Sequence, residues 1–308
     1  MSQATPPHSL VDRESPFRLP DDAVVVCHDA GAANIIVAGL AQVGINPTWR
    51  VLMRGPAATI WSHATGTTSD ARDLDDLLQD ASLLLTGTGW SSSLEHDARV
   101  KGATRSIPSV ALVDHWVNYP QRFVRDGTTQ LPDELWVSDE DAQAIAQREF
   151  DQVALRLVPN RYLASQVDEI GPLSEASASE VLYVAEPVRD DWAGSTPGEF
   201  QALDYFASRF DTLAVPRDAV VRLRPHPSDP PGKYDDWAHR TPLSVVIDDS
   251  PTLAEAMAHA RWVVGTESAA MVVALAAGRT VWCSLPPWAP PCRLPQQGII
   301  KLADQNSV

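Results

Sequence analysis

The stretch AVVVCHDAGAANIIVAGLAQVG, at residues 23–44, decides how the whole chain is interpreted. It opens with consecutive apolar residues, mostly β-branched, which is typical of a strand covered on both faces in a parallel sheet. A polar loop with Asp29 and Gly31 follows, and small and apolar residues then recur at helical spacing until Gly44. The stretch therefore predicts a unit of strand, loop and helix.

The same order recurs along the chain. Further strands are expected at residues 49–53, 83–85, 110–113, 135–137, 155–158, 181–185, 219–223, 244–247, 262–264 and 280–282. Helical patterns separate most of them, and one helix is expected at residues 139–150 with Ser138 as its N-cap. Repeated units of this kind predict an α/β fold with two Rossmann-like, doubly wound domains that face a central cleft.

The segment SQVDEIGPLSEASASE, at residues 165–180, has the most linker-like composition inside the chain. We place the domain boundary there, which gives a flexible tail over residues 1–20, an N-terminal domain over residues 21–172 and a C-terminal domain over residues 173–308. Ligands of such folds bind beyond the carboxyl ends of the strands, so site residues are expected in the loops that follow them.

The length and the net charge of the chain exclude some classes of function. The 308 residues, of which 44% are hydrophobic, suffice for two packed domains. The net charge of −16 argues against a general nucleic-acid surface, because there is no positive excess to attract phosphates. An anionic ligand needs a local basic pocket.

Cysteine usage and hydropathy indicate the compartment. The three cysteines form no CxxC motif and are not grouped with histidines, so we expect a reducing compartment and no metal ion. Acidic pairs such as Asp248-Asp249 are expected to be solvated. No stretch has the apolar length of a signal peptide or a membrane span, and the protein is expected to be cytoplasmic.

The densest basic segment is RLRPHPS, at residues 222–228, directly after a predicted strand. Its prolines restrict the backbone on both sides of His226, and strand alternation points Arg222 and Arg224 to one face. With Lys233 nearby, this segment suits a phosphate. The alternative is that the His-Pro pair merely ends the strand and the arginines meet carboxylates.

A second segment, VVGTESAA at residues 263–270, predicts a strand that ends at Gly265 and opens into a helix. Backbone N–H groups at the helix start, with the hydroxyls of Thr266 and Ser268, can hold a phosphate, and Glu267 can accept from ribose or sugar hydroxyls. Ordinary helix capping is the alternative. Together the two segments predict a donor site for a nucleotide, made of Arg224, His226, Pro227, Gly265, Thr266, Glu267 and Ser268.

The C-terminal half resembles the donor domain of GT-B glycosyltransferases, particularly sialyltransferases and polysialyltransferases, which use CMP-activated sugars. The resemblance covers roughly the last 120 residues and rests on VLYVAEPV, LRPHPSD and VVGTESAAMVVALAAG. It implies that the His-Pro loop contacts the donor phosphate and that two hydroxyls at the later helix start assist it, which carries over onto His226, Thr266 and Ser268. Glu267 separates those hydroxyls, unlike the adjacent pair of the family. A CMP-sugar is favoured, with UDP and CDP-alcohol donors left open.

The N-terminal half offers the acceptor side. Asp29 is the first candidate for the general base that takes the proton from an acceptor hydroxyl in an inverting transfer. His28 and Gly31 beside it are candidates for binding the acceptor or the sugar. A turn carboxylate is the alternative for Asp29. Two further loops supply the remaining candidates.

The loop TGTGWSSSLE, at residues 86–95, lacks the spacing of a phosphate-binding P-loop and is expected to form either a cleft wall or a serine-capped turn. Its candidate sugar-binding residues are Gly87, Thr88, Trp90, Ser91 and Glu95. In the segment DHWVNY, at residues 114–119, Asp114 and His115 are reserve bases and Trp116 is a candidate for packing on a sugar. The alternative there is an aromatic cluster with a hydrogen-bonded histidine.

These features predict a metal-independent, inverting glycosyltransferase without a cofactor. It would move a sugar from a nucleotide-activated donor to a hydroxyl of a glycan or small molecule, as in polysaccharide biosynthesis. A non-hydrolysing sugar-nucleotide epimerase is the first alternative, with acid and base groups from Asp114, His115 and Glu95. A nucleotide- or glycan-binding module without turnover is the second.

Overall fold

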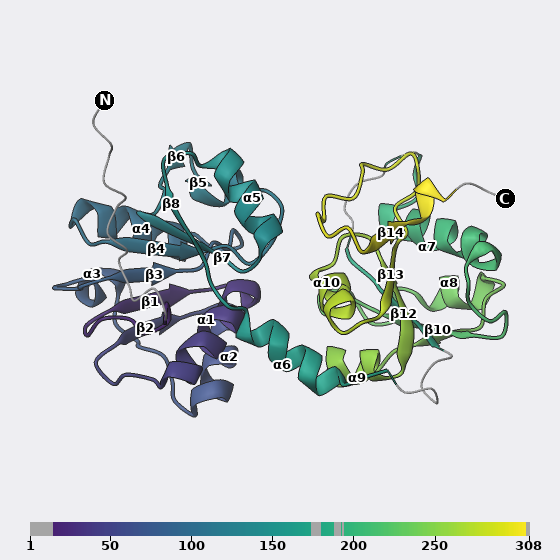
Figure 1. The fold of residues 1–308 in the computed structure, drawn as a ribbon, viewed down its shortest axis with the longest axis horizontal. Coiled ribbons are helices and arrows are strands. Elements are labelled where there is room, and N and C mark those ends of the chain that lie inside the picture. Colours follow the sequence, from purple (N-terminus) through teal and green to yellow (C-terminus); the bar gives the residue numbers. More distant parts are fainter. Residues whose placement is uncertain (1–14, 174–179, 188–191, 193, 306–308) are drawn as a thin grey trace. The chain divides into compact units, whose positions relative to one another are not determined.

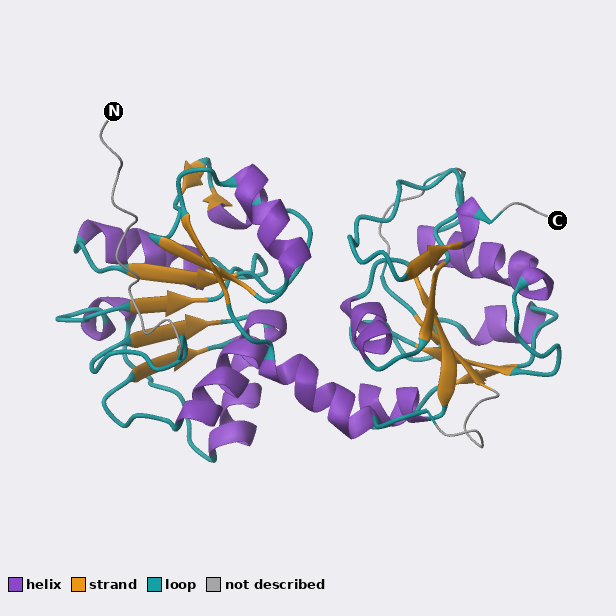
Figure 2. Ribbon diagram, in the orientation of Figure 1, coloured by secondary structure: helices purple, strands orange, loops and turns teal. Residues whose placement is uncertain are grey.

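The computed structural model describes residues 15–173, 180–187, 192 and 194–305. Contacts between residues divide the chain into two compact units, Met1–Leu163 and Ala164–Val308 (Figure 1). Each unit contains one six-stranded sheet with helices packed on it (Figure 2).

The sheet of the first unit has the strand order β2-β1-β3-β4-β7-β8, and all its neighbours pair in parallel. Its strands are β1 (Val24–Cys27), β2 (Arg50–Met53), β3 (Leu84–Thr86), β4 (Ser109–Leu112), β7 (Glu134–Val137) and β8 (Ala154–Leu157). Its helices are α1 (Ala30–Val43), α2 (Gly55–Thr65), α3 (Leu74–Leu77), α4 (Leu94–Thr104) and α5 (Glu140–Glu149). A short 3-10 helix (Pro120–Phe123) and a hairpin of β5 (Val124–Arg125) and β6 (Thr128–Thr129) follow β4.

Strand β1 shows why its sequence is apolar at every position. Val25 packs in a core cluster with side chains of α1 and α2, whereas Val24 and Val26 pack in another cluster with side chains of α3 and α4. Because neighbouring residues of a strand point to opposite faces, helices on both faces bury all of them. The first unit is therefore doubly wound, as the sequence predicts.

The sheet of the second unit has the order β11-β10-β9-β12-β13-β14 and is also parallel throughout. Its strands are β9 (Glu180–Val184), β10 (Val220–Arg224), β11 (Val245–Ile247), β12 (Ala260–Gly265), β13 (Thr280–Cys283) and β14 (Ile299–Lys301). Its helices are α6 (Arg161–Ile170, which begins in the first unit), α7 (Gly198–Arg209), α8 (Asp235–Arg240), α9 (Leu253–Ala258) and α10 (Ala269–Ala276). Two 3-10 turns lie at Phe210–Thr212 and Leu302–Asp304.

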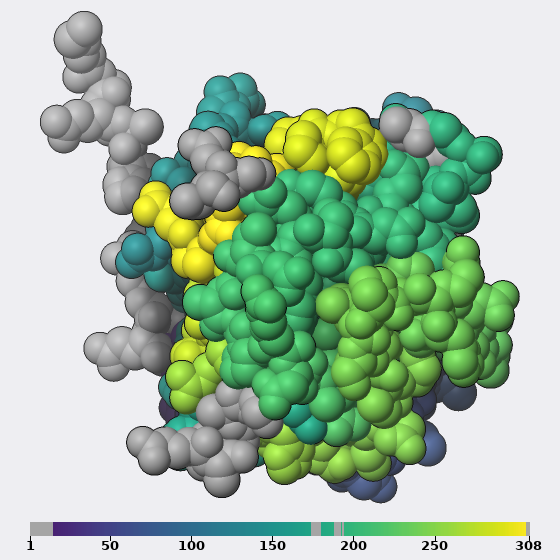
Figure 3. Space-filling model, turned by 90° about the vertical axis from the view of Figure 1, so that its right-hand side faces the viewer, coloured from purple at the N-terminus to yellow at the C-terminus, as the bar shows by residue number. Residues whose placement is uncertain are grey.

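Helices flank this second sheet as well. Phe206 of α7 and Trp237 of α8 share a core cluster with Val181 and Tyr183 of β9. Helix α10 contacts β12 and β13, and its Met271 lies against Gly265. In the view of Figure 3 the surface of this unit is formed mainly by green and light green segments, which include α7 and α8.

One local prediction is wrong. Asp139, not Ser138, is the N-cap of α5, and its carboxylate accepts the N–H of Ala142 at 2.7 Å. The first part of the predicted linker is helical, because α6 continues to Ile170, while residues 174–179 lie outside the described part of the chain. Strand β14 was not predicted at all. Among the described residues, no helix has both the length and the apolar character that crossing a membrane requires.

Candidate active site

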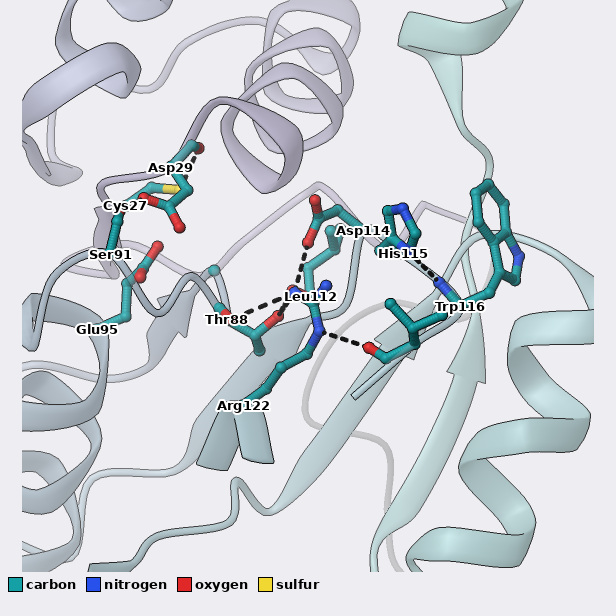
Figure 4. A network of polar contacts seen from close by, with 12 residues as sticks. Cys27, Asp29, Thr88, Ser91, Glu95, Leu112, Asp114, His115, Trp116 and Arg122 are labelled. Atoms are coloured by element: carbon teal, nitrogen blue, oxygen red, sulfur yellow. Dashed lines mark hydrogen bonds and ion pairs between the residues drawn. The ribbon is translucent and has the colours of Figure 1, made fainter. Parts of the chain in front are cut away.

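The predicted residues of the first unit follow three adjacent strands. Asp29 comes after β1, Thr88 and Ser91 come after β3, and Asp114 comes after β4 (Figure 4). In a parallel sheet these loops leave the same edge, where ligands of doubly wound folds bind. The strand order therefore brings together residues that are up to 85 positions apart in the sequence.

Asp29 is held by two hydrogen-bond donors. Its Oδ1 lies 2.8 Å from Nδ1 of His28 and also accepts the hydroxyl of Ser91. Burial raises the pKa of Asp29, but these hydrogen bonds and the His28 charge outweigh burial, so the net shift is downward. The side chains of His28 and Asp29 are 23% and 26% exposed. Asp29 is thus an ionised carboxylate within reach of a ligand.

Two glycines are required by the close approach of carboxylates. A Cβ atom at Gly89 would lie 2.1 Å from Oδ2 of Asp29, and one at Gly31 would lie 1.8 Å from Oδ2 of Asp114. A side chain at Gly89 would force the carboxylate of Asp29 to move, and a side chain at Gly31 would force that of Asp114 to move. Gly31 therefore has a structural role beside the candidate base.

The loop after β3 divides into a buried and an exposed part. Thr88 is fully buried and its hydroxyl donates to the carbonyl of Leu112 at 3.1 Å. Trp90 is 47% exposed, and Ser91 is exposed beside Asp29. Gly87 is also buried. Only Trp90 and Ser91 of the predicted sugar-binding residues of this loop are open to a ligand in this conformation.

Glu95 lies beneath the site rather than in it. Its side chain is fully buried in α4, and Oε1 accepts the backbone N–H of His28 at 3.0 Å. Its Oε2 has no hydrogen-bond partner among the residues that the structure describes, and burial raises the pKa of this carboxyl. In this conformation Glu95 does not reach a sugar, contrary to the sequence prediction, and it instead supports the loop that carries Asp29.

Asp114 is paired with an arginine that sequence reasoning missed. Nη1 of Arg122 lies 3.1 Å from Oδ1 of Asp114 and donates to the carbonyl of Thr88 at 3.3 Å. Arg122 is 8% exposed, and its guanidinium lies 5.6 Å from the centre of the Trp90 ring. No motif singles out Arg122, because its partners come from loops after different strands.

His115 and Trp116 match the alternative interpretation of their segment. The Trp116 backbone N–H donates to Nδ1 of His115 at 3.0 Å, and its indole N–H donates to Oδ2 of Asp139 at 2.8 Å. Trp116 also packs on the cluster of Tyr119 and Phe123. This arrangement is a hydrogen-bonded aromatic cluster.

In the second unit, three neighbouring strands again deliver polar side chains. His226 follows β10, Glu186 follows β9 and Thr266 follows β12. Nδ1 of His226 accepts the backbone N–H of Ser228 at 3.1 Å, so a neutral imidazole carries its proton on Nε2. His226 is partly exposed, and this N–H is the type of donor that a phosphate oxygen accepts.

Glu186 occupies the position that was predicted for a phosphate. Its Oε2 accepts the hydroxyl of Thr266 and the backbone N–H of Glu267, the latter at 2.7 Å. Burial raises the pKa of Glu186, although these hydrogen bonds oppose the shift. The sequence signal that was missed is an acidic residue just past a buried parallel strand.

The basic segment is neutralised by carboxylates. Arg224 pairs with Asp248, whose side chain is fully buried, and donates to the carbonyl of Ser250 at 3.0 Å. Arg222 pairs with Glu180 at 3.2 Å, and Lys233 pairs with Glu199 and Asp229. The prediction that Asp248 is solvated is wrong, because it lies between the two arginines.

The remaining predicted donor residues have local roles. Glu267 forms a two-point ion pair with Arg293, with Nη2 to Oε2 at 2.7 Å. Ser268 is the N-cap of α10 and accepts the N–H of Ala270. Gly265 ends β12 and Pro227 is exposed. Within the described part of the chain, no three His, Cys, Asp or Glu side chains are grouped to hold a metal ion.

Comparison with known proteins identifies the fold. No protein family and no curated protein matches the sequence. The S. aureus MnaA–UDP co-structure is similar, with a TM-score of 0.55 and 9% identity over 85% of this chain and 78% of that one. A Listeria monocytogenes structure, described as that of a candidate UDP-N-acetylglucosamine 2-epimerase, has a TM-score of 0.52 and 10% identity over 86% of this chain and 79% of that one. The structure of Acinetobacter baumannii MurG has a TM-score of 0.50 and 11% identity over 88% of this chain and 80% of that one.

This likeness confirms the predicted α/β fold of the GT-B type, with one Rossmann-like sheet in each unit. At such low identity it concerns the fold alone. None of the three names is that of a sialyltransferase, so the CMP-sugar part of the prediction has no support from these neighbours.

Proposed function

We propose that the chain is a glycosyltransferase that uses a nucleotide-activated sugar. The single observation that carries this proposal is Asp29, an ionised and accessible carboxylate that His28 and Ser91 orient at the carboxyl edge of a parallel sheet. MurG, whose fold is similar, lends fold-level support to the transferase class.

In the proposed reaction Asp29 accepts the proton of the acceptor hydroxyl. The acceptor oxygen attacks the anomeric carbon while the bond from that carbon to the donor phosphate breaks, which inverts the configuration. The phosphate leaves with the bonding electron pair, and the Nε2–H of His226 donates a hydrogen bond to its developing charge. Arg224 does not contact the phosphate in this proposal, because its guanidinium is already paired with the carboxylate of Asp248.

The donor nucleotide is proposed to be a pyrimidine nucleotide. The resemblance of residues 223–229 and 263–278 to sialyltransferases favours CMP. The names of two neighbours contain UDP, which makes it the competing choice. Glu267 is engaged by Arg293, so a ribose contact from Glu267 requires that pair to open.

A thermal-shift panel of CMP, CDP, UDP, GDP and their sugar conjugates tests the proposal. A ligand that binds only the folded chain at about 100 times its dissociation constant adds about 2.7 kcal/mol to the free energy of unfolding. We expect one pyrimidine nucleotide and its sugar conjugate to raise the melting temperature selectively. A panel without any selective ligand would remove the donor assignment.

An epimerase is the second candidate, because two of the three neighbours include UDP or an epimerase in their names. The side chains proposed for its acid and base chemistry are less available than Asp29, since Glu95 is fully buried and Asp114 is paired with Arg122. Incubation with the donor alone separates the two: an epimerised sugar favours the epimerase. Donor binding without product in any acceptor screen favours a binding module.

A further inference from the structure

Two of the three cysteines lie together in the second unit. Cys283 is the last residue of β13, and Cys292 lies in the loop that follows. Their sulfur atoms are 3.1 and 3.7 Å from the same oxygen, the backbone carbonyl of Thr266. Cys27 is buried in the core of the first unit and is not part of this pair.

Both thiols line one cavity of about 340 Å³. The rest of its wall comes from Lys301, Ala303 and Asp304 and from the loop between the cysteines, which contains four prolines. The space is ample for a small oxidant, and Cys292 is partly exposed. A reagent can therefore reach the pair without unfolding of the sheet.

The two thiols are chemically unequal. A hydrogen bond from Cys283 lowers the pKa of Cys292, and the charge of Lys301 acts in the same direction, although burial and Glu267 oppose it. The same hydrogen bond and burial raise the pKa of Cys283. Cys292 is therefore the sulfur that more readily becomes a thiolate, the form that attacks oxidants.

We propose that Cys283 and Cys292 form a peroxide-sensitive modification site that closes to a reversible disulfide. The Cys292 thiolate attacks one oxygen of hydrogen peroxide, the O–O bond breaks, and the departing hydroxide takes up a proton to become water. The resulting sulfenic acid is attacked by the Cys283 sulfur, the S–O bond breaks, and a second water leaves. Two thiols are oxidised and one peroxide is reduced to two waters.

The loop favours closure over further oxidation. The prolines of this loop restrict its backbone, so little conformational freedom remains to be lost when its ends are joined. Both sulfurs lie against one carbonyl oxygen, and a rotation of the two side chains that brings the sulfurs to bonding distance would close the disulfide. This inference does not depend on the proposed glycosyltransferase activity.

The test exposes the full-length chain to hydrogen peroxide and follows it by free-thiol counts, intact mass and peptide mapping. We expect the wild type to lose two of its three thiols, to become lighter by two hydrogen atoms, and to recover both thiols with dithiothreitol. Cys292→Ser should slow thiol loss by about tenfold or more, since the low-pKa sulfur is absent. Cys283→Ser should accumulate a sulfenic acid at Cys292 that dimedone traps.

Cys27→Ser is the matched control and should form the disulfide at the wild-type rate. Circular dichroism checks that each variant is folded. If a variant is not folded, the peptide map of the oxidised wild type still shows whether Cys283 and Cys292 are joined. Oxidation of Cys27 as fast as the pair, sulfinic acid without a disulfide, or a Cys292→Ser variant that reacts at the wild-type rate would each overturn the proposal.

Discussion

At the scale of the residue, Asp29 owes its character to two neighbours. Its carboxylate accepts from His28, the preceding residue in the chain, and from Ser91, which lies 62 positions away. Burial alone would raise the pKa of Asp29, and these donors reverse the sign. The pKa of Asp29 therefore reports directly on whether the loops after β1 and β3 are assembled.

Ser91→Ala should raise the pKa of Asp29 toward or above its ordinary value, because one donor is lost while burial remains. In the wild type the depressed pKa stabilises the fold above the ordinary range of an aspartate, and this stabilisation is lost as the pH falls through the folded pKa. As the pH is lowered, the Ser91→Ala variant should lose this stabilisation at a higher pH than the wild type does. NMR titration of the carboxyl measures the shift.

The matched control is Ser93→Ala, because Ser93 donates to Asp97 in the first turn of α4 and not to Asp29. It should leave the Asp29 titration unchanged. If both serine variants titrate alike, the hydrogen bond from Ser91 does not set this pKa.

At the scale of the element, α4 supports the loop after β1 from below. Glu95 accepts the His28 backbone N–H from a fully buried position, so a helix contributes the acceptor that a loop needs. Burial raises its pKa, which means that its stabilising contribution is complete below the ordinary glutamate range and is lost as the pH rises through the folded pKa.

Glu95→Gln should keep the bond to His28 while removing the buried charge, so its free energy of unfolding should exceed that of the wild type increasingly as the pH rises toward neutral. Glu95→Ala leaves the His28 N–H without its acceptor and should lower the free energy of unfolding by about 1–3 kcal/mol. Urea unfolding between pH 4 and 8 measures both, with the exposed Glu149→Gln as control. Equal stability of the Gln and Ala variants would contradict this role of Glu95.

At the scale of the whole molecule, the proposed general base and the residue proposed to donate a hydrogen bond to the donor phosphate belong to different units. Asp29 lies in the unit of residues 1–163 and His226 in that of residues 164–308. Substitution of one residue at a time therefore tests the proton transfer and the nucleotide binding separately.

His226→Ala should weaken nucleotide binding by about 10-fold or more, the loss expected for a hydrogen bond to a charged group. Asp29→Asn should leave nucleotide binding unchanged and lower the rate of transfer by about 10²–10⁴-fold, as for loss of a general base. Calorimetry and turnover measure the two separately, and Asp126→Asn, on an exposed turn, is the control. A loss of nucleotide affinity in Asp29→Asn would refute this division.

The amino-acid sequence alone determined the two α/β sheets. A strand covered on both faces must be apolar at every position, and such continuous apolar runs can be recognised directly in the sequence. It also located the loops of Asp29, His226 and Thr266, because ligand loops follow the strands of a parallel sheet. The partners of those residues depended on tertiary structure. Only the strand orders β1-β3-β4 and β11-β10-β9-β12 bring Ser91 to Asp29, Arg122 to Thr88, Glu186 to Thr266 and Asp248 to Arg224. Ion pairs and hydrogen bonds between loops follow spatial order rather than sequence spacing, and for that reason a basic segment that suggested a phosphate site proved to be internally neutralised.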